Sequence, residues 1–449
     1  MSNDIPLIGG RIRQLRRQKG ISQANLAREM DISSSYLNLI EHNRRKLTVP
    51  ILLKLAQKFG LEIGDLTASN EQRISSDLME LFSDDVFGDI DLTNHDIREF
   101  TNTSPAVARA IMLLYDQFRE AREKSVPDAD VAETRLASEQ VSDFLQGNGN
   151  YFQSLEAVAE RVSHDIGGSD IELARLNGYL MNVFGISVSV GQYEAPTTFS
   201  ADQARLRISD VLPVPSRLFA VAKCIGEQAA EMEITDLVEN ANFSHASVED
   251  LARSALASYV AGAIIMPYDA FLAAAEGTKY DVERLSVRFN VSFEQICHRL
   301  TTLQRPGNSG IPFHLVRTDI AGNISKRFSN SGINIPRHGG ACPRWNVYEA
   351  FMQPGRITIQ VSQMPDESRF FCIARTLTKG ENSHNGDVKH MSIGLGCDLA
   401  HAHRLVYSEG YDLANPRRIT PVGISCRVCP RRNCTNRAFP ALVEMRATG

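Results

Sequence analysis

The spacing of apolar residues in the first sixty positions most restricts how this 449-residue chain can fold. Apolar residues recur there at helical spacing, in short runs that polar residues and glycine interrupt. Ser22 can cap a helix over 23–30, and Ser33 can cap a helix over 34–41 after a tight turn. Together with an arginine-rich helix before them and an apolar helix over 49–59 after them, these two helices predict an N-terminal bundle of five helices.

The same segment is basic, whereas the rest of the chain is acidic. Residues 1–60 contain eleven Lys or Arg against four Asp or Glu, a formal charge of +7, so the remainder must carry −12 for the whole chain to reach −5. This asymmetry fits a segment that contacts phosphates. A solvated, charged helix face produces the same bias, so charge alone does not choose between the two.

The segment from Arg11 to Gly60, RIRQLRRQKGISQANLAREMDISSSYLNLIEHNRRKLTVPILLKLAQKFG, resembles the phage-repressor, or Xre-type, helix-turn-helix family. The resemblance implies that the third helix enters the major groove of a double-stranded DNA operator. Serine and asparagine can donate to and accept from base edges, and arginine supplies charge to phosphates. The residues implied in DNA binding are Gln23, Ser33, Ser34, Ser35, Tyr36, Asn38, Asn43, Arg44 and Arg45. The alternative is a bundle in which Tyr36 and Leu39 only fill the core.

Domains of this kind usually bind DNA as dimers on paired half-sites, so a homodimer or a higher homo-oligomer is expected. An acidic stretch over 84–91 and a strong helical pattern over 106–124 follow the bundle. This segment is expected to be a helical connector. Whether it also contributes to a dimer interface is not decided by its charge.

The middle of the chain, residues 150–305, is predicted to be mostly helical, with short strands near 186–190 and 205–208. Two of its segments, Leu212 to Glu231 and Ala255 to Phe271, resemble the core of the ImmA/IrrE-type zinc metallopeptidases. Those enzymes hold zinc with two histidines four residues apart, a glutamate general base between them and a later acidic ligand.

The residues that zinc chemistry needs are replaced in this chain. Lys223 and Glu227 stand at the histidine positions, Cys224 at the general base and Leu256 at the third ligand, and no HExxH pattern occurs anywhere. A protonated lysine and a leucine cannot bind zinc, so a peptidase scaffold that is not an enzyme is expected. The cleft left empty is then a place for a small ligand. A metal-dependent peptidase that acts on a repressor remains the alternative.

The C-terminal part has the pattern of an α+β domain. Apolar or alternating strands are predicted over 311–316, 357–361, 370–374 and 390–393, with helical segments over 346–351 and 398–405. The fold class is therefore multidomain, mainly α with an α+β C-terminal half. The expected domains are the helix-turn-helix bundle over 1–68, the helical connector over 69–148, the degenerate peptidase-like domain over 149–306 and an α+β sensor domain over 307–449.

A cysteine cluster is the most informative feature of the C-terminal domain. The segment CRVCPRRNC brings three thiols into one arginine-rich loop, and two further cysteines lie in the sequences ACP and GCD. Thiolates at this spacing match tetrahedral zinc or an iron-sulfur cluster. The expected metal ligands are Cys342, Cys397, Cys426, Cys429 and Cys434. The alternative is buried thiols without a metal.

The order of these segments resembles the short-chain fatty acyl-CoA regulators, a family of transcriptional regulators of propionate and acetate metabolism. The motifs that carry the resemblance are HLVRTDIAGNISKRFS, GGACPRWNVYEAFMQPG, GLGCDLAHAHRLVY and CRVCPRRNC. The resemblance implies that a short acyl-CoA, propionyl-CoA or acetyl-CoA, changes the affinity for the operator. Some relatives are thought to hold an iron-sulfur cluster in the tail. A redox sensor that uses the metal cluster is a further alternative.

Four residues are expected to bind the CoA phosphates. They lie in the sequence GNISKR after a strand, where backbone donors and cations can hold phosphate. These residues are Asn323, Ser325, Lys326 and Arg327. A solvated turn explains the same sequence equally well.

The first ten residues, MSNDIPLIGG, lack the basic and apolar stretches of a secretion signal, and the most apolar run, 259–275, is interrupted by Pro267 and Asp269. No membrane association is therefore expected.

The eight cysteines are distributed over a large chain, and three of them lie in one loop. This distribution indicates a reducing compartment. We expect a cytoplasmic protein.

Overall fold

The computed structural model describes residues 12, 16, 21–41, 45, 48, 51, 54–55, 58, 70–82, 84–87, 92, 94–123, 129–168, 171–243, 245–337, 340–380 and 388–438. Its contacts divide the chain into two compact units, one up to Arg119 and the other from Glu120 to Met445. The boundary predicted at residue 68 lies outside the described residues. The unit boundary falls within the predicted connector over 69–148.

In the first unit, helices α2 (Gln23–Glu29) and α3 (Ser34–Glu41) form a helix-turn-helix, called the head. Ser22 Oγ and Ser33 Oγ each accept a hydrogen bond from a backbone N–H group in the first turn of the following helix. Both serines thus cap the helices that the sequence pattern assigned to them. The core of the head consists of Ile12, Leu26, Ala27, Met30, Leu37, Ile40, Ile51 and Leu55.

Further helices of the first unit follow the head. Tyr115 donates a 2.6 Å hydrogen bond to Asp84 Oδ2, and its ring centroid lies 5.8 Å from that of Phe87. This contact joins the last helix of the unit to the acidic turn that precedes it. The elements are α6 (Asn70–Leu81), η1 (Asp85–Phe87), α7 (Asn94–Thr103) and α8 (Pro105–Glu123).

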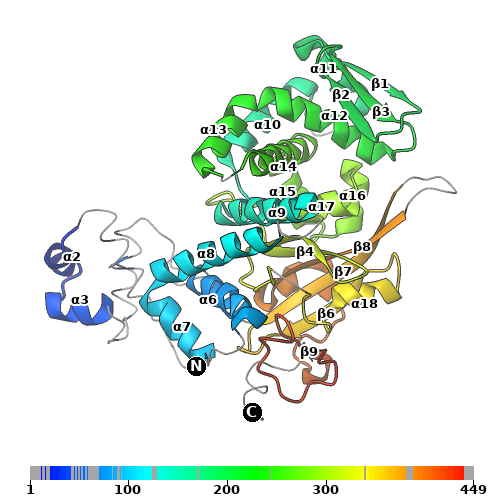
Figure 1. Cartoon of the computed structure of the whole chain (residues 1–449). Coiled ribbons are helices and arrows are strands. Elements are labelled where there is room, and N and C mark those ends of the chain that lie inside the picture. Colours follow the sequence, from blue (N-terminus) through cyan, green and yellow to red (C-terminus); the bar gives the residue numbers. More distant parts are fainter. Residues whose placement is uncertain are drawn as a thin grey trace. The chain divides into compact units, whose positions relative to one another are not determined.

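The second unit begins with a helical layer and a small sheet (Figure 1). The sheet has the order β1-β3-β2, with β1 parallel and β2 antiparallel to β3. Its strands are β1 (Ser187–Gly191), β2 (Thr197–Ser200) and β3 (Arg205–Ser209). The helices are α9 (Ala129–Gly147), α10 (Gln153–Ile166), α11 (Leu173–Phe184), α12 (Val214–Ala229), α13 (Glu231–Ala241), α14 (Ala246–Ile265), α15 (Tyr268–Gly277), α16 (Val282–Phe289) and α17 (Phe293–Thr301).

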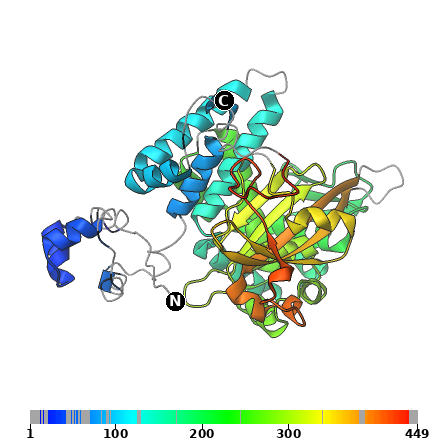
Figure 2. The same cartoon turned by 90° about the horizontal axis from the view of Figure 1, so that it is seen from below.

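A larger sheet of the order β5-β4-β8-β7-β6-β9 completes this unit; its strands are yellow and orange in Figure 2. All neighbours are antiparallel except β6 and β9. The strands are β4 (Phe313–Asp319), β5 (Ile324–Ser329), β6 (Thr358–Gln363), β7 (Arg369–Gly380), β8 (Val388–Asp398) and β9 (Ile419–Pro421). The short helices beside them are α18 (Asn346–Glu349), η2 (Ala350–Met352), η3 (Leu399–Arg404), η4 (Val406–Ser408) and η5 (Pro416–Arg418).

The two faces of the larger sheet belong to different cores. On the helix-covered face, Phe313, Phe371 and Leu395 join the core of the helical layer. On the loop-covered face, Val316 and Cys372 pack under residues of the segments 333–350 and 422–424. Because side chains alternate along a strand, neighbouring residues of one strand belong to different cores.

Two glycines of β8 let the loop-covered face pack closely. A Cβ atom at Gly394 would lie 2.5 Å from Val347 Cγ1, and one at Gly396 would lie 2.5 Å from the His314 ring. A glycine inside a strand marks a close approach of this kind. The missing side chains let α18 pack directly on β8 and let the His314 ring of β4 lie over Gly396.

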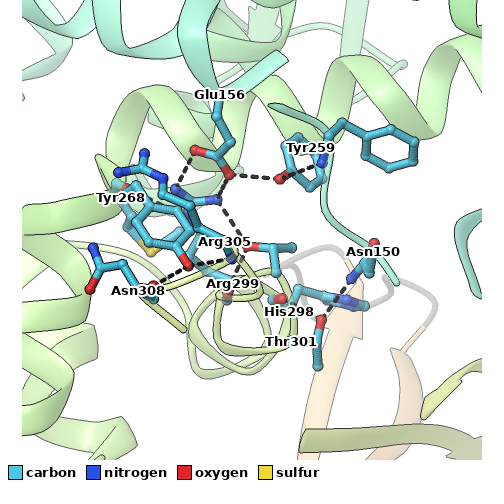
Figure 3. A network of polar contacts seen from close by, with 12 residues as sticks. Asn150, Glu156, Tyr259, Tyr268, His298, Arg299, Thr301, Arg305 and Asn308 are labelled. Atoms are coloured by element: carbon cyan, nitrogen blue, oxygen red, sulfur yellow. Dashed lines mark hydrogen bonds and ion pairs between the residues drawn. The ribbon is translucent and has the colours of Figure 1, made fainter. Parts of the chain in front are cut away.

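A buried ion pair joins three helices of the second unit (Figure 3). Arg299 on α17 donates from Nη1 and Nη2 to both carboxylate oxygens of Glu156 on α10, at 2.6 and 2.9 Å. Tyr259 on α14 donates to Glu156 Oε1 at 2.6 Å, and Arg299 Nε donates to Met266 O at 2.9 Å. Glu156 and Arg299 are only 4% and 3% exposed, so this pair is shielded from water.

The network continues toward the larger sheet. Tyr268 accepts a hydrogen bond from Arg305 N at 2.8 Å and donates to Asn308 O at 2.9 Å (Figure 3). The Arg305 guanidinium carbon lies 4.1 Å from the centroid of the Tyr268 ring, within the range of a cation–π contact. These contacts fix the chain where it leaves α17 and enters β4.

The structure confirms the predicted fold class and most of its elements. Strands β4, β6, β7 and β8 and helices α8 and α18 cover the segments predicted for them. The alternative interpretation of the GNISKR segment as a solvated turn is wrong for most of it, because Ile324–Ser329 forms strand β5 and pairs with β4. The turn lies earlier, where Gly322 has a φ of +89° that favours glycine.

Within the described residues, no single helix has the length and apolar character of a membrane span. Helices α14 and α15, which are bent by 66°, meet that test only as a pair.

We expect Arg299→Leu to lower the free energy of unfolding of the second unit by about 3–5 kcal/mol, because it leaves the Glu156 carboxylate buried without its counter-charge. Urea unfolding followed by circular dichroism measures the loss. Arg284→Leu is the control, because its pair with Asp281 has a 3.9 Å separation and the Arg284 side chain is 77% exposed. That change should cost at most about 1 kcal/mol. Equal losses in the two variants would contradict the expected role of the buried pair.

Candidate functional site

Glu41, at the end of α3, is the buried acceptor that holds the head together. Its carboxylate accepts hydrogen bonds from Arg16 Nε at 2.6 Å, from Arg16 Nη2 at 3.0 Å and from Gln23 Nε2 at 2.9 Å. These hydrogen bonds raise the pKa of the Arg16 guanidinium above its usual value. Gln23, predicted to bind DNA, thus sits at the junction of α2 and α3. The sequence analysis missed Arg16 and Glu41, because their pairing joins residues 25 positions apart.

Most of the residues predicted to contact DNA lie on α3 and at its N-cap, on one side of the head. Ser33, Ser34, Ser35 and Asn38 are exposed, whereas Leu37 and Ile40 of the same helix are buried. Asn38 Oδ1 lies 3.3 Å from Gln23 Nε2, so the start of α2 adjoins this side. A row of small polar side chains on one helix face can reach base edges.

The remaining predicted DNA contacts follow α3. Arg45 places its guanidinium carbon 5.4 Å from the centroid of the Tyr36 ring, and Tyr36 is half-buried. Asn43 and Arg44 lie outside the described residues. The assignment of individual residues to bases or phosphates stays a prediction.

The positions that correspond to a peptidase zinc site contain other contacts. Lys223 Nζ donates to Ser254 Oγ at 2.8 Å and lies 3.7 Å from Glu227 Oε1. Leu256 is fully buried, and burial raises the pKa of the Cys224 thiol to about 12. A Cβ atom at Gly226 would lie 3.1 Å from Val260 Cβ, so α12 and α14 pack directly at this point. These contacts do not support the expected ligand cleft there.

The four residues predicted to bind CoA phosphates are not gathered into one site. Asn323 donates from its backbone N and from Nδ2 to the Asp319 carboxylate. Arg327 pairs with Asp143 at 3.2 Å, and Lys326 Nζ lies 3.5 Å from His298 Nε2. The backbone of 324–329 is part of a strand, so it does not present the run of free donors that a phosphate-binding turn requires. Their role in phosphate binding stays a prediction.

A cavity lies between α18 and the loop-covered face of the larger sheet. It is small, with a free volume of about 20 Å³, which is room for little more than one water molecule. All ten residues that line it are buried. They are His314, Val316, Ile333, Trp345, Asn346, Val347, Gln360, Ser362, Cys372 and Gly394.

The polar groups around the cavity bond mainly to each other and to the backbone. Asn346 Nδ2 donates to Cys372 O at 3.2 Å, and Ser362 Oγ donates to Gln360 Oε1 at 2.8 Å. His314 Nδ1 lies 2.7 Å from Ser331 Oγ. Burial lowers the pKa of His314 to about 3, so its ring is neutral at physiological pH. The cavity therefore offers apolar walls and neutral polar groups.

This cavity was not predicted from the sequence. Its lining comes from segments between residues 314 and 394, and most of these residues have no local signature. The one local signal was the pair of glycines in GLG, at 394 and 396 inside an apolar strand.

The structure brings Cys342 to the cysteine-rich segment around Cys426, Cys429 and Cys434, called the cysteine loop (Cys426–Cys434). Cys342 N donates to Ile424 O at 2.8 Å. Burial raises the pKa of the Cys342 thiol, and the nearby Cys426 and Cys429 thiols raise it further. Arg437 donates to the carbonyl oxygens of Cys426 at 2.8 Å and Cys429 at 3.1 Å, which places a cation against the loop.

Cys397 is not part of this group. It faces the helix-covered core and pairs in register with Phe313 and Phe371, whereas Cys342 belongs to the core of the other face. Side-chain alternation along β8 accounts for the separation. Among the described residues, no three His, Cys, Asp or Glu side chains are arranged closely enough to hold a metal ion.

Trp345 connects the cysteine loop to the cavity. Its Nε1 donates to Gly423 O at 3.0 Å, three residues before Cys426, while its ring lines the cavity. A Cβ atom at Gly423 would lie 2.8 Å from Cys429 Sγ, so the loop closes tightly against this point. Trp345 and Gly423 therefore link the cysteine loop to one wall of the cavity.

Three family models match successive parts of the chain. The model of a helix-turn-helix matches residues 12–66, and that of an IrrE N-terminal-like domain matches residues 179–301. The model of a short-chain fatty acyl coenzyme A regulator, C-terminal, matches residues 302–447.

Full-length relatives carry the same arrangement. The chain is 38% identical to an HTH-type transcriptional regulator PrpR of Mycobacterium tuberculosis, over 97% of this chain and 92% of the relative. It is 38% identical to RamB of the same species and 37% identical to a propionyl-CoA carboxylase regulator of Cereibacter sphaeroides, each over 97% of this chain and 94% of the relative. A solved structure of a Mycobacterium tuberculosis transcriptional regulator, 41% identical, superposes with a TM-score of 0.66 and covers 68% of this chain and 94% of that chain.

We expect His314 to contribute to loss of stability in acid. Its pKa is about 3 in the folded protein and about 6.5 for an unperturbed histidine, so between these values only the unfolded state binds the proton. Falling pH then favours unfolding by up to about 1.4 kcal/mol per pH unit. In His314→Gln, the stability measured by urea unfolding should fall less steeply between pH 6.5 and 4. The exposed His403→Gln controls for the loss of one histidine, and identical slopes in wild type and His314→Gln would contradict the prediction.

Proposed function

Because the chain belongs to the family of short-chain fatty acyl coenzyme A regulators, we propose that it is a cytoplasmic, operator-specific transcriptional regulator controlled by a short-chain acyl-CoA. Propionyl-CoA or acetyl-CoA is the proposed effector, and the regulated genes are those of short-chain fatty acid metabolism. The names of the relatives and the description of the C-terminal family model support this choice.

The helix-turn-helix geometry of the head is the observation that carries the proposal. Helix α3 exposes small polar side chains and is anchored at its end, through Glu41, to Arg16 and Gln23. A recognition helix needs both properties, because a base contact discriminates only when the helix is held rigidly.

The chain is a regulator rather than an enzyme, since its full-length relatives are transcriptional regulators. This sets aside the peptidase alternative. The contacts of Lys223 with Ser254 and Glu227 agree with a scaffold that has lost zinc chemistry.

A homodimer or higher homo-oligomer is part of the proposal. Val107, Leu114 and Phe118 on α8 are 51%, 67% and 43% exposed, and their spacing places them on one face of the helix. An apolar helix face of this kind fits the same face of a second copy. Two heads held together could then read paired half-sites.

Asn38→Ala should weaken binding to the DNA upstream of the protein's own gene by about 5- to 160-fold, because one good base contact contributes about 1–3 kcal/mol. Arg45→Ala should weaken binding to this DNA and to random duplex alike, since phosphate contacts carry no sequence information. Fluorescence anisotropy at fixed salt measures both affinities.

The exposed Asn102→Ala on α7 is the matched control for Asn38→Ala and should leave both affinities unchanged. Wild-type protein that binds the upstream DNA no better than random duplex would overturn the proposed regulator.

The effector is tested by thermal unfolding of the anaerobically purified protein with free CoA and with acetyl-, propionyl-, butyryl- and a long-chain acyl-CoA. A ligand present at a hundred times its Kd stabilises the folded protein by about 2.7 kcal/mol, which shifts the Tm by a few degrees. One short ester should stabilise the protein more than free CoA does. A flat response to every ester would remove acyl-CoA as the effector.

A metal bound at the cysteine loop is the second part of the proposal. Cys342, Cys426, Cys429 and Cys434 form the proposed ligand set, because thiolates are the ligands of iron-sulfur clusters and of zinc. In the described structure these side chains are not close enough to hold a metal, so binding would have to draw the loop together. The charge of Arg437 at the loop carbonyls favours an anionic thiolate site. Such a metal would fix the conformation of the loop. Cys397 is left out, since it faces the other core.

Replacing Cys426, Cys429 and Cys434 together by serine should remove iron or zinc from the anaerobically purified protein, as measured by elemental analysis. Acid-labile sulfide and visible absorption separate a cluster from zinc. Cys397→Ser is the matched control and should retain the metal. Metal-free wild type, or metal retained in the triple variant, would contradict the site.

A redox sensor is the second candidate function, favoured by the contact of Trp345 with Gly423, against which Cys429 packs. It predicts that exposure to oxygen changes DNA binding when no CoA ester is present. DNA binding that is insensitive to oxygen would exclude it.

A further inference from the structure

We propose that Asp143 and Gln146, near the end of α9, couple ligand binding in the second unit to the DNA-binding head. The inference rests on the proposed function, because it assumes that a ligand of this unit changes the affinity for DNA. It goes further by naming two positioning residues for that coupling. Neither residue is among those predicted to contact DNA, CoA or a metal.

Helix α9 stands where the covalent connection to the head leaves the second unit. It is the first helix that lies wholly in this unit. Figure 1 shows it on the side of the helical layer that faces the larger sheet. Ala137 and Val141 are buried in the core of the helical layer, whereas Gln146 hydrogen-bonds to the sheet. One helix therefore contacts both layers and continues toward the head.

Gln146 pairs with the outer edge of the larger sheet. Its Nε2 donates to Ser329 O at 2.6 Å, and its Oε1 accepts from Ser329 N at 2.8 Å. Strand β5 stands first in the sheet order, so its outer backbone groups need a partner other than β4. A side-chain amide has a donor and an acceptor, as a peptide group does, so Gln146 takes the place of a further strand at this point.

Asp143 binds two arginines of the same region. Its carboxylate accepts a hydrogen bond from Arg327 Nη2 on β5 at 3.2 Å and forms an ion pair with Arg337. The two arginine side chains are 15% and 11% exposed, so salt and water screen these pairs less than they screen surface pairs. Residues three apart share a helix face, so Asp143 and Gln146 contact the sheet from the same side of α9.

The segment 329–337 lies between these contacts and enters the loop-covered face. Ile333 and Ile335 are buried in the core of that face. The segment is held at one end through Ser329 and at the other through Arg337, both by α9. A ligand or metal that repacks the loop-covered face displaces this segment, and the displacement reaches α9 through both contacts.

The full-length variants Asp143→Asn and Gln146→Leu test the coupling. The Kd of the upstream DNA is measured with and without saturating propionyl-CoA or acetyl-CoA, whichever binds more tightly, and the Kd of this ester with and without saturating DNA. In wild type, each ligand should change the Kd of the other by the same factor. In both variants that factor should fall to about 1, while ester and DNA each still bind.

Asp236→Asn, at an exposed position of α13, is the control and should keep the wild-type factor. A contact that only stabilises the unit would lower the free energy of unfolding of the two test variants and leave the factor unchanged. That result would overturn the inference and leave the proposed regulator intact. A factor of 1 in wild type would instead contradict both.

Hydrogen–deuterium exchange supplies an independent readout without DNA. The saturating ester should change the exchange of the backbone amides of 137–147 in wild type but not in Gln146→Leu. Exchange that the ester leaves unchanged in wild-type α9, although ester and DNA are coupled, would exclude α9 as the coupling element.

Discussion

The burial of both faces of the larger sheet is the constraint on which the rest of the second unit depends. The helix-covered face completes the core of the helical layer, and the loop-covered face supports α18 and the segments around it. Two residues that follow each other along β7 or β8 therefore pack into different cores. Cys397 faces the helices, while Gly396 beside it lets His314 approach Cys372. A single strand thus packs against the helices on one face and lines a small buried pocket on the other.

The buried pair of Glu156 and Arg299 has a related role in the helical layer. It connects α10, α14 and α17 just before the chain enters β4 (Figure 3). A buried ion pair stabilises a fold only when its remaining hydrogen bonds are satisfied, and here Tyr259, Thr302 and the Met266 carbonyl satisfy them. The layer that has lost zinc chemistry therefore keeps a fixed internal frame. Such a frame can support a neighbouring ligand domain without catalysing a reaction.

The parts of the fold that sequence analysis predicted are those encoded by short, periodic segments. The head was predicted because its caps and apolar positions repeat within 40 residues, and β7 because its first half contains a continuous apolar run, residues 370–374. Strand β5 was missed because it lies at the sheet edge and carries polar residues such as Lys326. The cavity and the Arg16–Glu41 pair depend on residues far apart in the chain, and no local pattern encodes such contacts. The face that each cysteine occupies likewise follows from strand register, which the sequence alone did not provide.

The central claim is that a short acyl-CoA bound to the second unit changes the affinity of the head for its operator. The most direct test measures the Kd of the upstream DNA with and without saturating ester, and the Kd of the ester with and without saturating DNA. The ester changes the Kd of the DNA by one ratio, and the DNA changes the Kd of the ester by another. Linkage requires these two ratios to be equal, and we expect each to be about 5 to 150. Two Kd values that are each independent of the other ligand would contradict the account, even if ester and DNA both bind tightly.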